Sequence, residues 1–464
     1  MKAALKNLVE LSESKTASSE DFAHFPLPDT MSAMTVHRDE TEIFHGLAFH
    51  EKDPRRSLHY EEVPLPEVGP NEVLVAVMAS ALNFNNVWSS LFEPSPGFNY
   101  IGEYSRYSPV NAKHNLDYHI LGTDGAGVVV RTGSAVTRWK PGDRVMIFGP
   151  TCDVSSPEVF DDEIRDPHLM AYGFETNFGS FADFTLVREH QLLPKPEHLT
   201  WVEAASMTLV ATTTYRMLVS RNGAQMSQGD NVLIWGASGG LGTFAIQFVL
   251  NGGGIPVGVV SSEEKAAMVR KMGCERVIVL PRSEGEDRFL DGNGHTKNRQ
   301  ILRLKAQIRK LTGGEDPDIV FEHTGRSTFA ASVAVARPGG KIVTCGSTSG
   351  YDHVFDNRYL WQTVKHIIGS HAANYYEAVQ TARLIGKGFL YPTLSRVFPL
   401  AEGAEAFSML HKGTHMGKLG FLNIAPEENM GIRDYELREK VGEEKIRLFR
   451  CDDGACPAER CAVA

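Results

Sequence analysis

The sequence predicts an α/β protein with two domains, one rich in short β-strands and one built on a doubly wound parallel sheet. Its 464 residues exceed what one hydrophobic core usually holds. From about residue 58, short Val-rich runs are separated by Gly, Pro and Asp, which is typical of strands joined by tight turns. From about residue 205, apolar strands alternate with helical stretches, which predicts parallel strands joined by right-handed crossovers.

The composition is that of a soluble globular protein and argues against several functional classes. Hydrophobic residues make up 42% of the chain and charged residues 22%, so sizeable cores can form. A net charge of -10, with no Lys/Arg-rich block between aromatic residues, argues against nucleic-acid binding. No stretch approaches the roughly 18 apolar residues of a membrane helix, and the start, MKAALKNLVELSESK, lacks the apolar core of a signal peptide. We therefore expect a cytoplasmic protein.

The residue pattern changes along the chain and suggests where the domains begin and end. The first 45 residues are polar and interrupted by FPLPDT, so an irregular arm with at most one short helix is expected. The runs EVLVAVMASAL, GAGVVVRTG, DRVMIFG and FADFTLV predict strands of the first domain, and strand-like pieces after about residue 392 are expected to rejoin it. The predicted divisions are an arm (1–45), a first domain (46–212 and 372–450), a second domain (213–371) and a tail (451–464).

Six cysteines are too sparse for a disulfide framework in a chain of this length, so reduced thiols are expected. Three of them, Cys451, Cys456 and Cys461, recur every five residues in the final segment CDDGACPAERCAVA. That segment has no His and no paired CxxC spacing, which argues against a metal site. We interpret it as a flexible tail.

The strand NVLIWG runs directly into a glycine-rich turn and then into the amphipathic stretch TFAIQFVL. This order suits a dinucleotide, because glycines let the backbone approach a pyrophosphate and the helix N-terminus offers unpaired N–H groups. A second strand, IPVGVV, and the helix EEKAAMVRKMG follow, which favours this interpretation over a merely tight turn. The residues expected to bind the cofactor here are Gly236, Ser238, Gly239, Gly240, Leu241 and Gly242.

The end of the second strand indicates which dinucleotide is used. NAD enzymes usually place an acidic residue here to hold the ribose 2′-hydroxyl, whereas this chain has Ser261 and Ser262. With Lys265 one helical turn on and Arg282 after the next strand, these hydroxyls suit a 2′-phosphate and predict NADPH. Glu263 and Glu264, which follow directly, weigh against this prediction. In the alternative interpretation Ser262 caps the helix and Lys265 is a solvated surface charge.

The segment GTDGAGVVVRTGSAVTRWKPGDRV resembles the signature of medium-chain dehydrogenases. Zinc-dependent alcohol-oxidising members carry His-Glu where this chain has Thr123-Asp124, so the resemblance implies that the metal ligand is missing. Cys152 is the only cysteine before the dinucleotide-binding half, which leaves neither a catalytic Cys ligand nor four cysteines for structural zinc. We therefore expect no metal, and hydride addition to the activated C=C bond of an enoyl or quinone substrate.

Six further segments make the resemblance specific. They are SALNFNNVWSSLFEP, YGFETNFGSFADF, SRNGAQMSQGDNVLIWGASGGLG, DIVFEHTGR, TSGYDHVFDNRYLW and HIIGSHAANY. Together they are similar to the crotonyl-CoA carboxylase/reductase family, over roughly residues 45–450. The resemblance implies a GroES-like catalytic domain with a Rossmann domain, and hydride transfer from NADPH to the β-carbon of an enoyl-CoA. The resulting enolate would attack CO2 at its α-carbon to give an alkylmalonyl-CoA.

The resemblance also implies a CO2 pocket, whose Asn, Phe-Glu pair and His correspond to Asn83, Phe174, Glu175 and His371. CO2 needs hydrogen-bond donors aimed at its oxygens, inside a dry wall that keeps protons from the enolate. Asn83 and His371 can donate. Glu175 can orient His371, and Phe174 can exclude solvent. Singly, Asn83 could instead hold a loop, His371 could be a satisfied core histidine and Glu175 a solvated charge; their joint occurrence favours the pocket.

CoA carries a 3′-phosphate and a pyrophosphate, so its groove should present cations near an aromatic surface for adenine. The pair Arg358-Tyr359 fits this pattern. Arg303 and Arg309, on the predicted helix before DPDIVFEH, match family positions less securely and would otherwise form a solvated helix face.

The identity of the substrate stays open. Family members commonly carry Pro-Gly and then Leu-Val-Asn on the approach to the first Rossmann helix, where this chain has MTLVA over residues 207–211. Besides crotonyl-CoA, a longer or branched enoyl-CoA that yields polyketide extender units is therefore an alternative. Two other interpretations remain, a plain enoyl-CoA reductase in which a proton replaces CO2, and a quinone-reductase-like sensing or binding protein without turnover. A homo-oligomer, dimer or tetramer, is expected.

Overall fold

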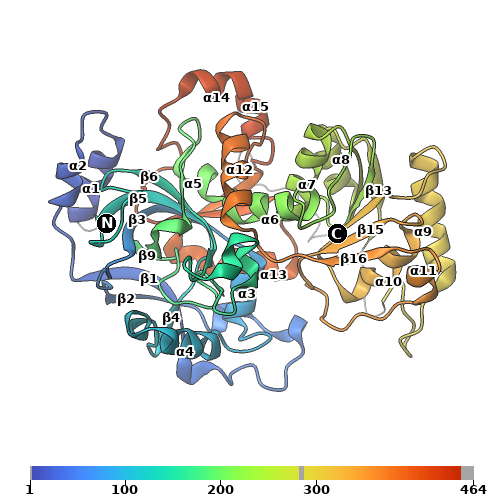
Figure 1. Ribbon diagram of the computed structural model, residues 1–464, viewed down its shortest axis with the longest axis horizontal. Helices are drawn as coiled ribbons and strands as arrows, with labels where there is room; N and C mark the ends of the chain where they lie inside the picture. Colours follow the sequence, from blue (N-terminus) through green and yellow to red (C-terminus); the bar gives the residue numbers. More distant parts are fainter. Residues whose placement is uncertain (1–2, 282–286, 451–464) are drawn as a thin grey trace. The chain divides into compact units, whose positions relative to one another are not determined.

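The computed structural model describes residues 3–281 and 287–450 (Figure 1). The chain divides into two compact units. The first contains the residues up to Leu209 together with those from Asn374 onward, and the second is Val210–Ala373. Arg282, predicted to bind the cofactor, and the predicted tail 451–464 lie outside the described residues. In the described part of the chain no helix is both long enough and apolar enough to cross a membrane.

The N-terminal segment differs from the irregular arm that the sequence suggests. It carries α1 (Ala3–Glu13), α2 (Ser19–Ala23) and β1 (Thr30–His37). α1 docks because Leu5, Leu8 and Val9 form a buried face with helical spacing. β1 pairs antiparallel with β2 (His59–Pro64) on one side and β4 (Tyr118–Ile120) on the other. The segment is therefore part of the folded first unit.

A seven-stranded sheet organises the rest of the first unit. The remaining strands of this unit are β3 (Glu72–Ala81), β5 (Gly125–Thr132), β6 (Arg144–Ile147), β7 (Pro150–Thr151), β8 (Met170–Ala171), β9 (Phe184–Arg188), β10 (Leu192–Pro194), β17 (Leu394–Pro399) and β18 (Lys418–Leu422). The sheet runs β10-β6-β5-β3-β18-β17, with β9 also paired to β3. All residues of β3 are buried, as a central strand requires. β18 pairs antiparallel with β3, placing Gly420 opposite Ala81, so the C-terminal segment rejoins this unit.

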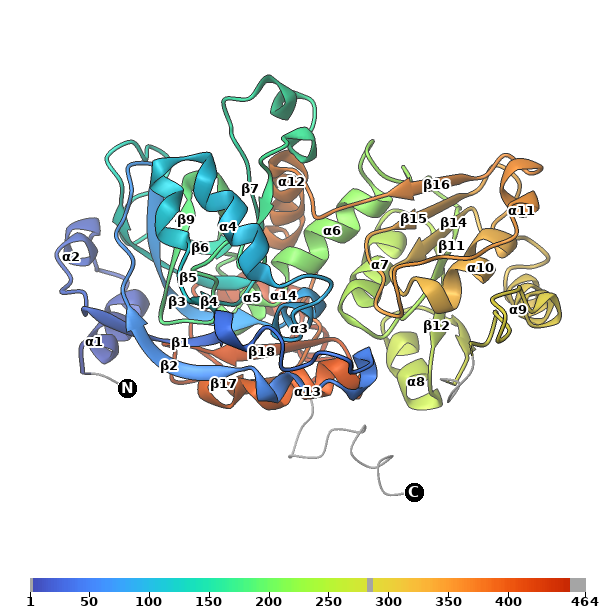
Figure 2. The same ribbon diagram turned by 90° about the horizontal axis from the view of Figure 1, so that it is seen from below.

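The helices of the first unit pack on this sheet or follow its strand ends. They are α3 (Phe84–Ser90), α4 (Gly97–Tyr107), α5 (Trp201–Ala205), α12 (Tyr375–Gly386), α13 (Gly403–Lys412), α14 (Tyr435–Val441) and α15 (Glu443–Ile446); α6 (Thr208–Leu218) begins at the end of this unit. α5 contacts β3, β5 and β18, and α13 contacts α3 and β17. Figure 2 shows β17 and β18 side by side next to α13. Only two residues separate the end of β3 from the start of α3, so the first residues of α3 lie at one end of the central strand.

The second unit is a six-stranded parallel sheet in the order β13-β12-β11-β14-β15-β16. Its strands are β11 (Asn231–Ile234), β12 (Ile255–Val260), β13 (Arg276–Val279), β14 (Ile319–Glu322), β15 (Lys341–Thr344) and β16 (His366–Gly369). Its helices are α7 (Gly240–Asn251), α8 (Glu263–Lys271), α9 (Asn298–Leu311), α10 (Arg326–Val335) and α11 (Arg358–Trp361). Right-handed crossovers put α7 and α8 on one face of the sheet and the other three helices on the opposite face (Figure 1). The two sheets together confirm the predicted α/β class.

The strand order of the second unit reverses beside β11, because β12 lies on one side of it and β14 on the other. In open α/β sheets, ligands bind outside the carboxyl ends of the strands at such a reversal. By this rule, the expected ligand site lies at the carboxyl end of β11, where the predicted glycine turn begins.

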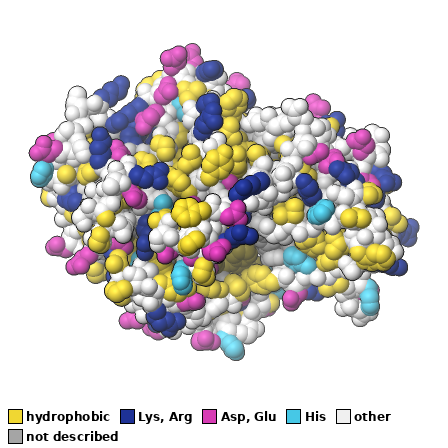
Figure 3. Space-filling view, in the orientation of Figure 1, with side chains coloured by type: hydrophobic (Ala, Val, Ile, Leu, Met, Phe, Trp, Pro, Cys, Tyr) yellow, Lys and Arg dark blue, Asp and Glu magenta, His cyan; other side chains and the backbone are white. Residues whose placement is uncertain are grey.

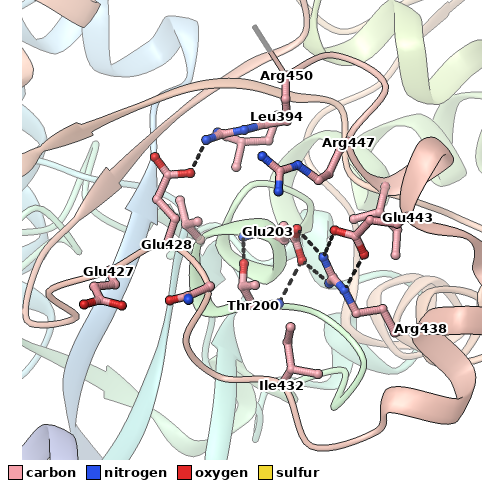
Figure 4. A pocket seen from close by; sticks show the side chains of 13 residues that line it. Thr200, Glu203, Leu394, Glu427, Glu428, Ile432, Arg438, Glu443, Arg447 and Arg450 are labelled. Carbon is pink, nitrogen blue, oxygen red and sulfur yellow. Dashed lines mark hydrogen bonds and ion pairs between the residues drawn. The ribbon is translucent and has the colours of Figure 1, made fainter. Parts of the chain in front are cut away.

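The C-terminal segment of the first unit is held to α5 by a buried ion pair. Arg438 of α14 donates two hydrogen bonds to Glu203, at 2.8 and 3.1 Å, and two more to Glu443, both at 2.8 Å. Glu203 is only 8% exposed. These residues line a pocket of about 400 Å³, whose wall also carries Arg447 and Arg450 (Figure 4).

We predict that Arg438→Met lowers the free energy of unfolding by about 3–5 kcal/mol, because it leaves the buried Glu203 carboxylate without its partner. Urea unfolding followed by intrinsic fluorescence measures this change. Arg447→Met is the matched control, since Arg447 is exposed on the same pocket wall; it should change the stability by no more than about 0.5 kcal/mol. Equal effects of the two substitutions would contradict the assignment.

Candidate active site

The predicted glycine turn lies between β11 and α7 in the second unit. Gly236 has a left-handed φ of +56°, and a Cβ there would lie 3.0 Å from the ring of His323. A Cβ on Gly242 would lie 2.3 Å from the carbonyl oxygen of Gly236, so both positions need glycine. Gly239 is the N-cap residue of α7, whose first N–H groups have no helical acceptor and can bind a pyrophosphate. The other residues predicted for this turn belong to the same segment: Ser238, Gly240 and Leu241.

The end of β12 has features of both interpretations offered by the sequence, a helix cap and a phosphate site. Ser262 caps α8, because its Oγ atom accepts from the backbone N–H of Lys265 at 3.3 Å. The Lys265 ammonium donates to Ser261 Oγ at 3.3 Å, so the cation and the hydroxyl lie together at the strand end. An ammonium beside a hydroxyl can bind a phosphate.

Phe174 and Glu175 lie in the loop between β8 and β9 in the first unit. The Glu175 carboxylate accepts from the backbone N–H of Ala171 at 2.7 Å, and the Glu175 N–H donates to the Ala171 carbonyl at 2.8 Å. Phe174 stacks on Tyr100 of α4, with ring centroids 6.4 Å apart and planes inclined by 28°. Burial raises the pKa of Glu175 above the ordinary glutamate value. Tyr100 was not predicted as a site residue, since its place beside this loop depends on tertiary packing.

Asn83 lies at the end of β3, as the N-cap residue of α3, and is only 6% exposed. Its Nδ2 group donates to Asp124 Oδ2 at 2.9 Å and to Thr123 Oγ1 at 3.2 Å. Its Oδ1 atom accepts from the Lys418 ammonium at 2.5 Å. Lys418 also lies 3.3 Å from Asp124 Oδ2, and the backbone N–H of Leu209 donates to Asp124 Oδ1 at 2.8 Å. We call Asn83, Thr123, Asp124 and Lys418 the Asn83 cluster.

The Asn83 cluster contains two buried charges of opposite sign. Asp124 is 0% exposed and Lys418 is 3% exposed. Burial raises the pKa of Asp124 and lowers that of Lys418, and the attraction between the two groups opposes both shifts. The cluster also meets the Phe174–Glu175 loop, because Ser180 Oγ donates to the Asp124 carbonyl at 2.6 Å. Lys418 was not predicted as a site residue, because only the pairing of β18 with β3 brings it to the cluster.

His371 belongs to the second unit, in the exposed segment that follows β16. The four residues predicted for the CO2 pocket are therefore divided between the units, with Asn83, Phe174 and Glu175 in the first. Within the first unit, the contact of Ser180 with Asp124 connects the loop of Phe174 to the Asn83 cluster.

The residues predicted to bind CoA all lie in the second unit, and two of the cations already have carboxylate partners. Arg309 forms a bidentate pair with Asp316, at 2.8 and 2.9 Å. Arg358 pairs with Asp356, the nearest atoms being 2.6 Å apart, although its side chain is 71% exposed. Arg303 is exposed, and Tyr359 packs partly buried against the core of this unit. A phosphate at Arg309 or Arg358 would have to share the guanidinium with a carboxylate.

The position occupied by His-Glu in zinc-dependent relatives is part of the Asn83 cluster. Thr123 and Asp124 are both buried there and bonded to Asn83. Among residues 3–281 and 287–450, no three His, Cys, Asp or Glu side chains are grouped as a metal site requires.

Two family models match the chain and agree with its two sheets. The alcohol dehydrogenase GroES-like domain matches residues 69–197, which lie in the first unit. The zinc-binding dehydrogenase model matches residues 240–386, which begin at the first turn of α7.

Similar proteins cover nearly the whole chain. A crotonyl-CoA reductase of Streptomyces collinus is 53% identical over 94% of this chain and 97% of its own length. A crotonyl-CoA carboxylase/reductase of Cereibacter sphaeroides is 36% identical over 88% of this chain and 91% of its own. Among solved structures, a 2-octenoyl-CoA carboxylase reductase in complex with NADP and 2-octenoyl-CoA matches with a TM-score of 0.90 and 48% identity, over 97% of this chain and 99% of that one. The chain belongs to the crotonyl-CoA carboxylase/reductase family of the medium-chain dehydrogenase/reductase superfamily.

Proposed function

We propose that this protein reduces an α,β-unsaturated acyl-CoA with NADPH and adds CO2 to the product enolate, which gives an alkylmalonyl-CoA. The observation that carries the proposal is the match over almost the whole chain to a 2-octenoyl-CoA carboxylase reductase with NADP and 2-octenoyl-CoA bound. The glycine turn beside β11 agrees with it, because both of its close approaches require glycine. We place the reaction in the cytoplasm.

NADPH supplies a hydride to the β-carbon when it is bound, and this chain's residues fit it at two points. The first N–H groups of α7 and the glycine turn suit the pyrophosphate. Ser261 and Lys265, which lie together at the end of β12, suit a 2′-phosphate. The position where NAD enzymes usually carry an acidic residue is a serine here, although Glu263 and Glu264 follow in the first turn of α8. Arg282 is proposed as a further phosphate ligand.

The proposed CO2 pocket works by discriminating between two electrophiles. Once hydride has arrived, CO2 and a proton compete for the same α-carbon. Asn83 and His371 donate hydrogen bonds to the oxygens of CO2, which become negatively charged as the bond forms. Glu175 orients His371, and Phe174, stacked on Tyr100, keeps water from the enolate.

The substrate is held through its CoA portion. Arg358, Arg303 and Arg309 are proposed for the phosphates and Tyr359 for adenine. The acyl group is crotonyl or longer, with the longer chain favoured by the likeness to an octenoyl-CoA enzyme. Such products serve as polyketide extender units. We propose that no metal takes part, because Thr123 and Asp124 replace the His-Glu of zinc relatives and are engaged with Asn83.

A plain enoyl-CoA reductase is the second candidate, and one observation favours it. Both N–H groups of the Asn83 amide already have acceptors, Asp124 and Thr123, within the first unit. An amide with no N–H to offer would leave the α-carbon to a proton.

Product analysis tests the proposed function directly. The enzyme, NADPH and a panel of enoyl-CoAs are mixed with and without labelled bicarbonate, and the products are weighed by mass spectrometry. We expect a labelled alkylmalonyl-CoA when bicarbonate is present and little turnover when NADH replaces NADPH. Reduced acyl-CoA as the only product at every bicarbonate concentration would establish the plain reductase, and equal use of NADH would contradict the assignment of Ser261 and Lys265.

We predict that His371→Asn shifts the products toward the reduced, uncarboxylated acyl-CoA. Losing one hydrogen bond to a developing carboxylate costs about 2–4 kcal/mol of transition-state stabilisation, which lets protonation win. The ratio of the two products at fixed CO2 measures the effect. His295→Asn, the same substitution at a side chain that is 79% exposed in the second unit, is the control. If His371→Asn lowers reduction and carboxylation in equal proportion, His371 serves the hydride step or the fold.

We further propose that the protein is a homo-oligomer, a dimer or tetramer, assembled through the edge of the second unit's sheet. β16 is the last strand on one side of that sheet. Its surroundings expose Trp361 by 63%, Val364 by 69% and Ile367 by 38%, and Figure 3 shows hydrophobic side chains gathered over this part of the unit. An apolar open edge is a template for pairing with a second copy.

Sedimentation velocity at micromolar concentration is expected to give a multiple of the chain mass. Ile367→Lys should raise the dissociation constant by about tenfold or more, because a charge on an edge strand opposes pairing. Leu302→Lys, at an exposed position of α9, should leave it unchanged. A wild-type protein of single-chain mass at all concentrations would rule out the assembly.

A further inference from the structure

Lys418 and Asp124 are buried charges that the proposed chemistry leaves without a role. The Lys418 ammonium has three acceptors, namely Leu82 O at 2.8 Å, Asn83 Oδ1 at 2.5 Å and Asp124 Oδ2 at 3.3 Å. Asp124 receives the backbone N–H of Leu209 on its other oxygen, at 2.8 Å. Both charges meet on the same side chain, the amide of Asn83.

This arrangement fixes which way the Asn83 amide faces. The two ends of an asparagine side chain have nearly the same shape, so packing alone does not distinguish its two orientations. Lys418 can only donate and therefore needs the Oδ1 atom. A carboxylate of Asp124 can only accept and needs the Nδ2 group. The reversed amide would face a cation with its N–H groups and a carboxylate with its oxygen.

We propose that Lys418 and Asp124 are positioning residues for carboxylation, holding the Asn83 amide in the orientation in which it can donate to CO2. The inference rests on the proposed function. It also shows how an amide that is already hydrogen-bonded can act as a donor. Of the two hydrogen bonds that Asn83 Nδ2 donates, the one to Thr123 Oγ1 is longer, at 3.2 Å against 2.9 Å for the one to Asp124. CO2 is therefore expected to replace Thr123 as the acceptor.

Two features of the Asn83 cluster support the replacement of Thr123 by CO2 as the acceptor of this N–H. The Thr123 hydroxyl has other partners, Asn85 Oδ1 at 3.2 Å and Asn86 Oδ1 at 3.3 Å, so it keeps hydrogen bonds when Asn83 turns from it. A cation on the amide oxygen also polarises the amide and strengthens its N–H groups as donors. A reversed amide would instead present its oxygen to the oxygens of CO2, which repel it.

The test compares the ratio of carboxylated to reduced product in variants that differ in what they do to the amide. Lys418→Met removes the cation but leaves Asp124 unpaired, which endangers folding. The double variant Asp124→Asn/Lys418→Met removes both charges, and neither substituted side chain dictates the orientation of the amide. The matched control is Lys195→Met. Lys195 is also a buried lysine, 4% exposed, and its ammonium donates to the carbonyls of Pro196 and Gly431 at 2.9 and 2.8 Å.

We expect the double variant to lower the product ratio by about tenfold or more at subsaturating CO2, in line with the loss of one preorganised donor. The KM for CO2 should rise with it. Lys195→Met should keep the ratio within about twofold of wild type, although it also removes a buried lysine whose side chain donates three hydrogen bonds. Circular dichroism shows that each variant is folded at the assay temperature.

Two outcomes overturn the inference while leaving the proposed function intact. One is a folded double variant with the wild-type product ratio. The other is an equal fall in the ratio for Lys195→Met, which would make the effect a general loss of rigidity. Failure of the wild-type enzyme to incorporate labelled bicarbonate is a separate result, and it removes the proposed function together with the inference.

Discussion

A carboxylate and an ammonium, both withdrawn from water, meet at one end of the first unit's central sheet. Desolvation costs several kcal/mol for each charge, and mutual attraction offsets this only when every remaining hydrogen-bonding position is used. The chain meets that condition with the N–H of Leu209, the carbonyl of Leu82 and the amide of Asn83. The ends of β3, β5 and β18 must therefore coincide, because each supplies or adjoins one of these groups.

The Asn83 cluster also explains how one superfamily position can serve two kinds of chemistry. Zinc-dependent relatives carry His-Glu where this chain has Thr123-Asp124, and a metal there polarises an oxygen substrate. Here Asp124 and Lys418 instead form hydrogen bonds with the two ends of the Asn83 amide. An enoyl thioester is already activated for hydride addition, so the remaining problem is which electrophile the enolate meets. Fixed donors in a dry environment address that problem, since they stabilise a growing carboxylate and offer no mobile proton.

Local patterns in the sequence were sufficient to predict the fold of the second unit. Its glycine turn, strand alternation and serine-capped helix each depend on residues close together in the chain, and the structure shows all three. The fold of the N-terminal segment was harder to predict from the sequence. Its mixed polar and apolar residues form the strand β1 through pairing with β2 and β4. Lys418 could not be predicted at all, since 294 positions separate it from Asp124 and only the sheet register brings them together. Asp356, in contrast, stands two residues before Arg358 in DNR, so their pairing had a visible signal in the sequence.

Glu175 shows that this unit accepts a cost in stability where the chemistry is proposed to occur. Burial raises its pKa, so the folded chain binds a proton on this carboxyl more tightly than the unfolded chain does. The cost in folding stability is therefore absent below the ordinary glutamate pKa, and it grows as the pH rises above that value. One N–H, from Ala171, offsets part of it. A solvated loop would avoid the cost, but it would also bring water to Phe174 and thereby supply the proton that competes with CO2. The partial burial that raises the pKa of Glu175 thus acts in the direction that carboxylation requires, because it limits the access of water to this loop.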